Sequence, residues 1–225
     1  MIQRLDRYMR DIKMKNFNKP AFTMIELILV VVVLGILATL AIPRLDRDIR
    51  QGAKDNILTA IRFTQHIALL DNQTEPDNNN WQKQLWTIRF TISNITNLAT
   101  FYTISSDENN NSAVSKDETA IDPVNGKFMY NLGGDTTIDD DESPNIFIGK
   151  KYGVDTMTFT GGCSNAQQHI AFDHLGRPHN GIGTATNTYD KYMATDCDIA
   201  ITFLDTSITV LNIKIATETG YVTGD

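Results

Sequence analysis

The chain has 225 residues, enough for one ordinary soluble domain together with an N-terminal helix. Hydrophobic residues make up 41 % and charged residues 21 %, a composition that argues against a disordered protein. The net charge is −7, but residues 1–21 carry six basic and two acidic side chains, so the remainder carries −11. An acidic body argues against nucleic acid as a partner, because phosphate binding needs a basic surface.

A long apolar run follows this basic segment, from Phe22 to Ile42, and Glu26 is its only charged residue. At 1.5 Å per residue, a helix of this length can cross roughly 30 Å of hydrocarbon. The basic residues precede the run, so the positive-inside bias predicts a cytoplasmic N-terminus and export of everything after Pro43. A cleaved secretory signal has a shorter apolar core and a small-residue site after it, whereas Ala21 comes before the run.

A plain signal anchor leaves Glu26 unexplained, because an acid at the centre of a membrane helix costs roughly 2.5–3.5 kcal/mol. The segment 19–27, KPAFTMIEL, resembles the processing site of type IV prepilins and type II secretion pseudopilins. The resemblance implies that a prepilin peptidase cuts between Ala21 and Phe22 and that Phe22 is then N-methylated. The family more often has Gly where Ala21 stands. Pro43 lies where the family has a helix-kinking proline.

Cleavage would create an α-amino group with an ordinary pKa of about 8, which is cationic at neutral pH. In a bundle of such helices the Glu26 carboxylate of one subunit can meet the buried ammonium of its neighbour, so that two costly charges compensate each other. We therefore expect Glu26 to set the register of subunits during assembly. Residues 1–21 form the basic leader, and Met14 is an alternative start that would leave a complete short leader.

The chain is expected to continue as an amphipathic helix over residues 44–70, with apolar residues recurring at helical spacing from Leu45 through Ala53, Ile57 and Ile61. Residues 22–43 would then be the membrane and assembly part of one long helix ending near Leu70. The polar run 71–80 is the predicted loop that leaves this helix.

Residues 71–225 are predicted to form a β-rich head, in which an antiparallel sheet covers the C-terminal half of the helix in an α+β, pilin-like fold. Seven short segments have strand character: 86–92, 98–104, 127–132, 155–160, 169–173, 199–204 and 207–215. Two long polar stretches, 105–123 and 133–144, are expected to be exposed or partly mobile loops.

The segment 171–178, AFDHLGRP, resembles a motif of H-type minor pseudopilins and FimT-like pilins, carried by Phe172, Asp173, Gly176 and Arg177. In that group a closing hairpin follows the motif, and the C-terminal segment 217–222 is similar to it. The residues themselves predict a structural role, because Gly176 permits a tight turn and Asp173 can cap the loop backbone. The resemblance favours a minor subunit.

Cys163 and Cys197 are the only cysteines, and in an oxidising periplasm they are expected to form a disulfide rather than a metal site. The histidines at 169, 174 and 179 are spaced five apart, which does not point three rings at one centre, so no metal is expected there. No cofactor is expected. The acidic residues at 107–108 and 139–142 leave calcium as an alternative, with a solvated acidic turn favoured.

Asn72, Asn94 and Asn110 begin Asn-x-Ser/Thr sequons, and Asn110 is a candidate for glycosylation because Glu108 precedes it by two positions.

The sequence thus predicts a structural minor subunit of a type II secretion pseudopilus or type IV pilus, and not an enzyme. It would be anchored by a single pass in the bacterial inner membrane, with its head in the periplasm, before it enters a filament. Its expected partners are prepilin peptidase, other pilins or pseudopilins, the inner-membrane assembly platform and the lipid bilayer. The alternative is a periplasmic binding or enzymatic domain tethered by a signal anchor, which would need neither the Ala21–Phe22 site nor Glu26.

Overall fold

The computed structural model describes residues 23–92, 100–133, 137–164, 166–185 and 189–225, and leaves the side chains of 39–47 and 92 undescribed. The chain divides into two compact units, residues 1–43 and 44–225. Helix α1 (Met24–Leu70) contributes to both units. The predicted helix start at Phe22 lies outside the described residues, and the end at Leu70 is confirmed.

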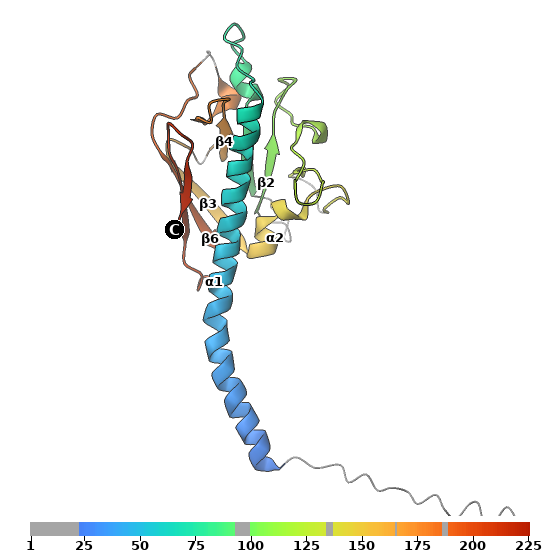
Figure 1. The fold of residues 1–225 in the computed structure, drawn as a ribbon, viewed down its shortest axis with the longest axis vertical. Coiled ribbons are helices and arrows are strands. Elements are labelled where there is room, and N and C mark those ends of the chain that lie inside the picture. The colour runs from blue at the N-terminus through green and yellow to red at the C-terminus, as the bar shows by residue number, and fades with distance from the viewer. Residues whose placement is uncertain (1–22, 93–99, 134–136, 165, 186–188) are drawn as a thin grey trace, which may run out of the picture. The chain divides into compact units, whose positions relative to one another are not determined.

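The second unit is an α+β domain in which the C-terminal part of α1 packs on two antiparallel sheets (Figure 1). The first sheet has the order β2-β1-β4-β5, with β1 (Trp86–Ile92), β2 (Thr100–Ser105), β4 (His169–Phe172) and β5 (Pro178–His179). The second has the order β3-β6-β7-β8, with β3 (Val154–Gly161), β6 (Cys197–Phe203), β7 (Leu211–Ile215) and β8 (Val222–Gly224). The single sheet expected from the sequence is therefore wrong.

Short helical elements complete the domain. Helix α2 (Ile148–Tyr152) precedes β3 and ends at Gly153, which adopts a left-handed conformation. The described residues include four 3₁₀ turns: η1 (Trp81–Gln84), η2 (Lys116–Glu118), η3 (Pro144–Ile146) and η4 (Ile182–Thr184). The sequence predicted none of these, because elements of three to five residues are too short to show a helical periodicity.

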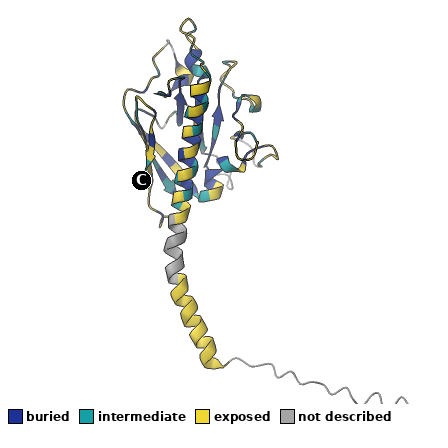
Figure 2. Cartoon of the chain, viewed as in Figure 1, coloured by how far each residue is buried: buried dark blue, intermediate teal, exposed yellow. Residues whose placement is uncertain are grey.

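The core lies between one face of α1 and the inner faces of both sheets (Figure 2). Ala53, Ile57 and Ile61 are fully buried at a spacing of four residues, as expected for the inward stripe of an amphipathic helix. The sequence pattern also predicted that Leu70 extends this buried face, but Leu70 is 75 % exposed, so that part of the prediction is wrong.

Strand burial follows the position of each strand in its sheet. β7 alternates strictly between buried and exposed residues, which is typical of a strand with one solvated face. All four residues of β4 are buried, because β4 pairs with β1 on one side and β5 on the other and both of its faces are covered.

Five of the seven predicted strands are present, β1 with the predicted bounds and the other four with shifted ends, and two need correction. Residues 127–132 form no strand. Phe128 takes part only in isolated bridges, and the carbonyl of Lys127 just before it accepts a hydrogen bond from the backbone N–H of Asp122. The segment predicted over 207–215 begins its strand only at Leu211. Asp205 accepts a hydrogen bond from the backbone N–H of Ser207, which closes a turn there instead. Strands β5 and β8 were missed, since two and three residues carry no readable alternation.

The polar stretches 105–123 and 133–144 are more ordered than expected. Asp122 is buried, and its carboxylate accepts hydrogen bonds from the Ser143 hydroxyl at 2.5 Å and from the side-chain amides of Asn125 and Asn145 at 3.1 and 2.9 Å. These hydrogen bonds hold the pKa of Asp122 below its usual value although burial opposes them. A single buried carboxylate therefore joins the two stretches.

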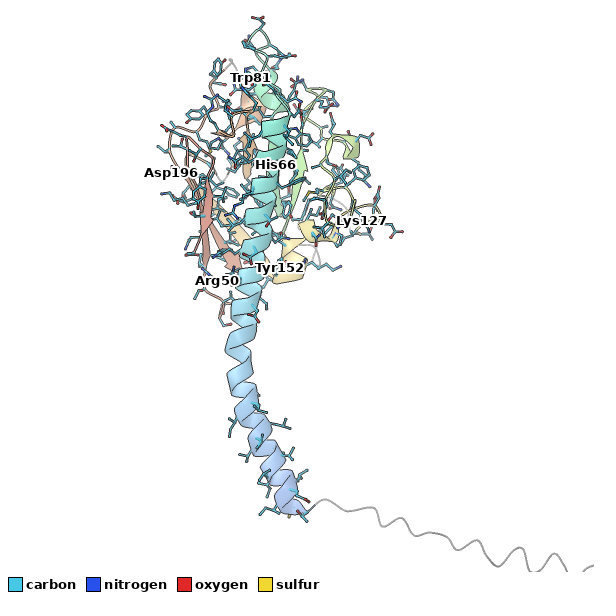
Figure 3. All side chains as sticks on the ribbon, viewed as in Figure 1. Arg50, His66, Trp81, Lys127, Tyr152 and Asp196 are labelled. Carbon is cyan, nitrogen blue, oxygen red and sulfur yellow. A yellow bond between two sulfur atoms is a disulfide. The ribbon has the colours of Figure 1, made fainter. Side chains whose placement is uncertain are left out.

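Arg50 joins α1 to the end of the second sheet (Figure 3). Its guanidinium donates to the backbone carbonyls of Thr209 and Val210 at 3.2 and 3.0 Å, and pairs with the Asp225 carboxylate at 2.6 Å. Asn212 binds the same carboxylate through its backbone and side chain. Helix and hairpin are thus held by charge-assisted hydrogen bonds as well as by apolar packing.

Candidate functional site

Helix α1 begins with a capping box. The Glu26 carboxylate accepts hydrogen bonds from the backbone N–H of Thr23 at 2.8 Å and from its hydroxyl at 2.9 Å, and the backbone N–H of Glu26 donates to the Thr23 hydroxyl at 3.3 Å. These bonds satisfy donors that an α-helix leaves free at its first turn. The sequence signal for this role is a Thr three residues before a Glu at the start of an apolar run, and the intermolecular interpretation of Glu26 overlooked it.

The apolar side chains of the first helical turns are all exposed in the isolated chain. Between Met24 and Leu37 the large hydrophobic residues are 46–84 % exposed, on every side of the helix. A helix that is apolar all round needs apolar surroundings, either lipid or other helices. Within the part of the chain that the structure describes, no helix is long and apolar enough to cross a membrane.

The other residues predicted for this segment are placed only in part. Ala21 and Phe22 lie outside the described residues, as does the basic leader. The helical backbone runs through Pro43, whose side chain is not described, and the predicted kink at this position stays a prediction.

Comparison with known protein families gives one match, the prokaryotic N-terminal methylation motif, over residues 16–42. The match spans the predicted cleavage position, the capping box and the apolar run. The chain therefore carries the signature of type IV pilin-like and pseudopilin precursors, as the sequence predicted. Neither the curated proteins nor the solved structures contain a match to this chain.

The disulfide predicted between Cys163 and Cys197 is present. Cys197 begins β6 and pairs with Gly161 at the end of β3, so the bond closes the end of this strand pair. Gly161 and Gly162 are required here: a Cβ on either would lie within 2.2 Å or 2.0 Å of the carbonyl oxygens of Asp196 and Thr195. The close backbone approach brings the two cysteine Cα atoms to 5.1 Å, within the range for a disulfide.

Asp173 is the centre of the second motif. Its buried carboxylate accepts from the backbone N–H groups of Leu175 and Arg177 at 3.0 and 2.9 Å, and pairs with the Arg177 guanidinium at 2.7 Å. Gly176 makes the turn with a φ of +77°. The hydrogen bonds to His179 and Arg177 hold the pKa of Asp173 well below its usual range, although burial acts in the opposite direction. The cap and the turn lie where the sequence predicted them.

This turn is docked on α1 and on the C-terminal hairpin. The side-chain amide of Gln65 donates to the carbonyl of Gly176 at 2.9 Å and to that of Thr219 at 2.8 Å. Gly220 is required at the same junction, because a Cβ there would lie 2.4 Å from the Gly176 carbonyl oxygen. The motif thus connects β4, α1 and the segment before β8.

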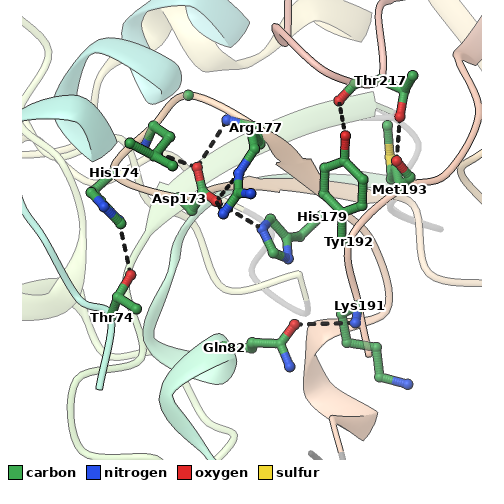
Figure 4. A network of polar contacts seen from close by, with 12 residues as sticks. Thr74, Gln82, Asp173, His174, Arg177, His179, Lys191, Tyr192, Met193 and Thr217 are labelled. Carbon is green, nitrogen blue, oxygen red and sulfur yellow. Dashed lines mark hydrogen bonds and ion pairs between the residues drawn. The ribbon is translucent and has the colours of Figure 1, made fainter. Parts of the chain in front are cut away.

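Arg177 also joins a polar and aromatic network on the head (Figure 4). Its guanidinium lies 5.6 Å from the centre of the Tyr192 ring, and the Tyr192 hydroxyl donates to the Thr217 carbonyl at 3.4 Å. His179 packs edge-on against both Tyr192 and Trp81, with ring centres 5.9 and 6.1 Å apart. These contacts join β5 to the segment before β6.

The three spaced histidines have separate partners. His174 contacts the Thr74 hydroxyl at 2.9 Å, His179 contacts Asp173 at 3.3 Å, and His169 contacts the carbonyl of Gln167 at 2.9 Å. Among the described residues, no group of three or more His, Cys, Asp or Glu side chains is arranged to hold a metal ion. In this geometry the three histidine rings serve as hydrogen-bonding and packing groups.

The acidic run at 139–142 has one cationic partner within the described part of the chain. Lys116 lies 3.3 Å from Asp139, 2.8 Å from Asp141 and 3.8 Å from Glu142. The hydrogen bond that the Lys116 ammonium donates to the Asp141 carboxylate is the largest of the causes that raise the pKa of Lys116. The solvated acidic turn favoured from the sequence therefore has a lysine partner, and calcium at this position stays a prediction without a test.

The sequons occupy different settings. Asn94 lies outside the described residues, while Asn72 accepts a hydrogen bond from the backbone N–H of Thr74 at 3.0 Å. Asn110 adopts a left-handed conformation with a φ of 57°, in a loop where Asp107 accepts from the backbone of Asn111. The Asn72 side chain thus has a partner within its own turn, whereas the buried Oδ1 of Asn110 has none among the described residues.

Proposed function

We propose that this chain is a minor structural subunit, made as a prepilin, of a type II secretion pseudopilus or a type IV pilus, and that it is not an enzyme. The observation that supports this most strongly is the methylation motif over residues 16–42, together with an acid at Glu26 in an otherwise apolar helix. The resemblance of the 171–178 segment to H-type and FimT-like subunits supports the assignment to a minor subunit.

Processing begins with hydrolysis of the peptide bond between Ala21 and Phe22 by a prepilin peptidase. The reaction removes the basic leader and leaves Phe22 with a free α-amino group, which is then methylated. Ala21 is small enough to replace the glycine that is more common at this position. Removal of the leader also removes the basic residues that orient the precursor.

Before assembly, the run 22–42 would lie in the inner membrane, with the leader in the cytoplasm and the head in the periplasm. The exposed apolar surface between Met24 and Leu37 supports this placement, because water is an unfavourable solvent for it. The Cys163–Cys197 disulfide is consistent with an oxidising compartment. Assembly transfers the apolar helix from lipid into a bundle of like helices and leaves the head on the filament surface.

Glu26 has two successive roles in this scheme. In the isolated subunit its carboxylate caps the helix through Thr23, which keeps a charged group hydrogen-bonded in apolar surroundings. In the filament it would pair with the Phe22 ammonium of a neighbouring subunit. The pair would act mainly by fixing the register between neighbouring subunits. A subunit in another register would leave a buried charge unpaired, which is far more costly than a paired one.

Two substitutions separate these roles. Glu26→Gln keeps a side-chain oxygen that can accept from Thr23 but removes the charge, whereas Glu26→Leu removes both. We expect both variants to be processed, and both to be strongly depleted from filaments. If Glu26→Gln entered filaments as well as the unsubstituted chain, pairing with an ammonium would not be what the carboxylate provides.

Processing is tested by mass spectrometry of the mature N-terminus, in membranes from cells with and without the prepilin peptidase. The proposal predicts a chain beginning with N-methylated Phe22 that is absent without the peptidase. A chain that keeps its leader in both strains would support a domain tethered by a signal anchor instead. Intact precursor from the peptidase-negative strain would also show whether translation begins at Met1 or Met14.

A further inference from the structure

A small pocket lies on the outer face of the first sheet. Its volume is about 60 Å³, and its walls come from η1, β1, the end of β2, the loop 107–114 and η4. Thr87 and Arg89 are two apart on β1 and therefore face the same side, and Ser105 pairs with Thr87 across the ladder. The intervening Ile88 belongs to the core under α1, so the pocket faces away from that helix.

Two cations, Lys83 and Arg89, line this pocket. Within the part of the chain that the structure describes, neither side chain has a hydrogen-bonding or ion-pair partner, although the charge of Arg89 acts on the nearby His169 ring, in a protein whose net charge is −7. Other cations of the head, such as Arg50 and Lys116, have carboxylate partners. An acidic protein that leaves two cations unpaired in one small pocket favours an anion there.

The rest of the lining supplies hydroxyl groups and one carboxylate. Ser105 and Ser112 contribute hydroxyl side chains to the pocket, whereas the Thr87 hydroxyl already donates to the carbonyl of Leu85 at 2.8 Å. The Asp107 carboxylate also lines it, but its two oxygens accept hydrogen bonds from the backbone N–H groups of Asn111 and Ser112, at 3.2 and 2.9 Å. The formal charge of the lining is therefore +1, with the one anion already hydrogen-bonded.

The walls are fixed by contacts outside the pocket. The Ser106 hydroxyl donates to the carbonyl of Gln84 at 2.5 Å, and the Gln84 side chain donates to the carbonyl of Glu108 at 2.8 Å. These two hydrogen bonds join η1 to the loop after β2. On the opposite side, the backbone N–H groups of Gly181 and Ile182 donate to Nε2 of His169 at 3.1 and 3.4 Å, which fixes η4 on β4. Such preformed walls reduce the ordering cost of binding a ligand.

We propose that this pocket binds a single oxyanion group, a carboxylate or a phosphate. Arg89 offers a planar guanidinium with several donors, suited to two oxygens of one group, and Lys83 adds a second charge. The volume fits a group of this size and excludes a larger ligand from complete burial. The site is independent of the N-terminal segment, so it would give the head a ligand-dependent contact that the assembly helix does not provide.

The test uses the full chain purified in mild detergent, titrated with inorganic phosphate and separately with acetate, while sodium chloride keeps the ionic strength constant. Backbone amide shifts of residues on β1 and in the loop 107–114 report binding at this pocket. The double variant Lys83→Gln/Arg89→Gln removes both charges, and Lys127→Gln/Lys150→Gln removes the same charge from positions outside the pocket. Lys83→Gln alone is the variant to use if the double variant does not fold.

We expect saturable binding of at least one anion to the unsubstituted chain and to the Lys127/Lys150 control. We expect the double variant to bind at least tenfold more weakly, and Lys83→Gln to bind several-fold more weakly. Saturation with both anions would assign an oxyanion in general, and saturation with phosphate alone would assign a phosphate group. Shifts that do not saturate, or an equal dissociation constant in the double variant, would overturn the proposal.

Discussion

His169 is predicted to make the head sensitive to acid. Its ring is almost fully buried, Nδ1 contacts the Gln167 carbonyl, and Nε2 accepts from the backbone of Gly181 and Ile182. This arrangement requires a neutral ring with its proton on Nδ1. Burial, and after it the positive charge of Arg89, lower the pKa of His169 from 6.5 to about 4.

The direction in which stability changes with pH follows from the lowered pKa of His169. Between the folded and unfolded pKa values the unfolded chain binds the proton and the folded chain does not, so stability falls as the pH falls through this window. From about pH 7 to about pH 4.5, the loss of unfolding free energy due to this one histidine is on the order of 2 kcal/mol. That is a large part of the stability of an ordinary domain.

The assay is urea unfolding of the full chain in mild detergent, followed by tryptophan fluorescence at several pH values across this window. His169→Gln removes the titrating ring and should lose less stability on acidification, by about 2 kcal/mol, although it starts from a lower stability. His66→Gln is the matched control, because it makes the same substitution at an exposed position of α1. An equal acid loss in His169→Gln and the unsubstituted chain would refute the reasoning.

Three further changes test the packing of the head by urea unfolding. Replacing Cys163 and Cys197 together by alanine should cost about 4 kcal/mol, since the bond closes a loop with a sequence separation of 34, and a loss below about 1 kcal/mol would contradict this. Asp173→Asn should cost about 3 kcal/mol, because the Arg177 guanidinium loses its buried anionic partner, and near-neutral stability would show that the carboxylate's charge is dispensable. Arg50→Leu should cost about 1–2 kcal/mol by releasing the hairpin end, and unchanged protection of the β7–β8 amides from hydrogen exchange would count against that role.

The elements that could be predicted from the sequence are those with a long or regular pattern. The apolar run after the basic leader and the four-residue spacing through Ala53, Ile57 and Ile61 indicated one long helix, and its end at Leu70 is confirmed. Alternation over 86–92 and 155–160 indicated strands because half-buried strands repeat every second residue. The disulfide followed from having only two cysteines and an exported domain.

The rest depended on contacts between residues far apart in the chain. Asp122 stands in a stretch that reads as a polar loop, and only the partners Ser143, Asn125 and Asn145 make it an internal anchor. The division into two sheets could not be predicted either, since strand patterns do not specify which strands pair.

The two candidate sites also differ in whether they could be recognised from the sequence. The processing segment is one continuous motif and could be recognised from the sequence alone. Lys83 and Arg89 belong to different elements, and without the fold each is an ordinary surface cation. Their position in one pocket is determined by the register of β1 with β2 and by the packing of η4.

The central claim is that this chain is a subunit of a filament, and it is tested most directly by analysing the filaments themselves. Pseudopili or pili are sheared from native-host cells, purified, and examined by quantitative mass spectrometry, with a strain lacking the prepilin peptidase as control. The account predicts that the mature chain, beginning at Phe22, copurifies with the other subunits at a low ratio and disappears from this fraction without the peptidase. Recovery only in the membrane fraction, while other subunits form normal filaments, would contradict it.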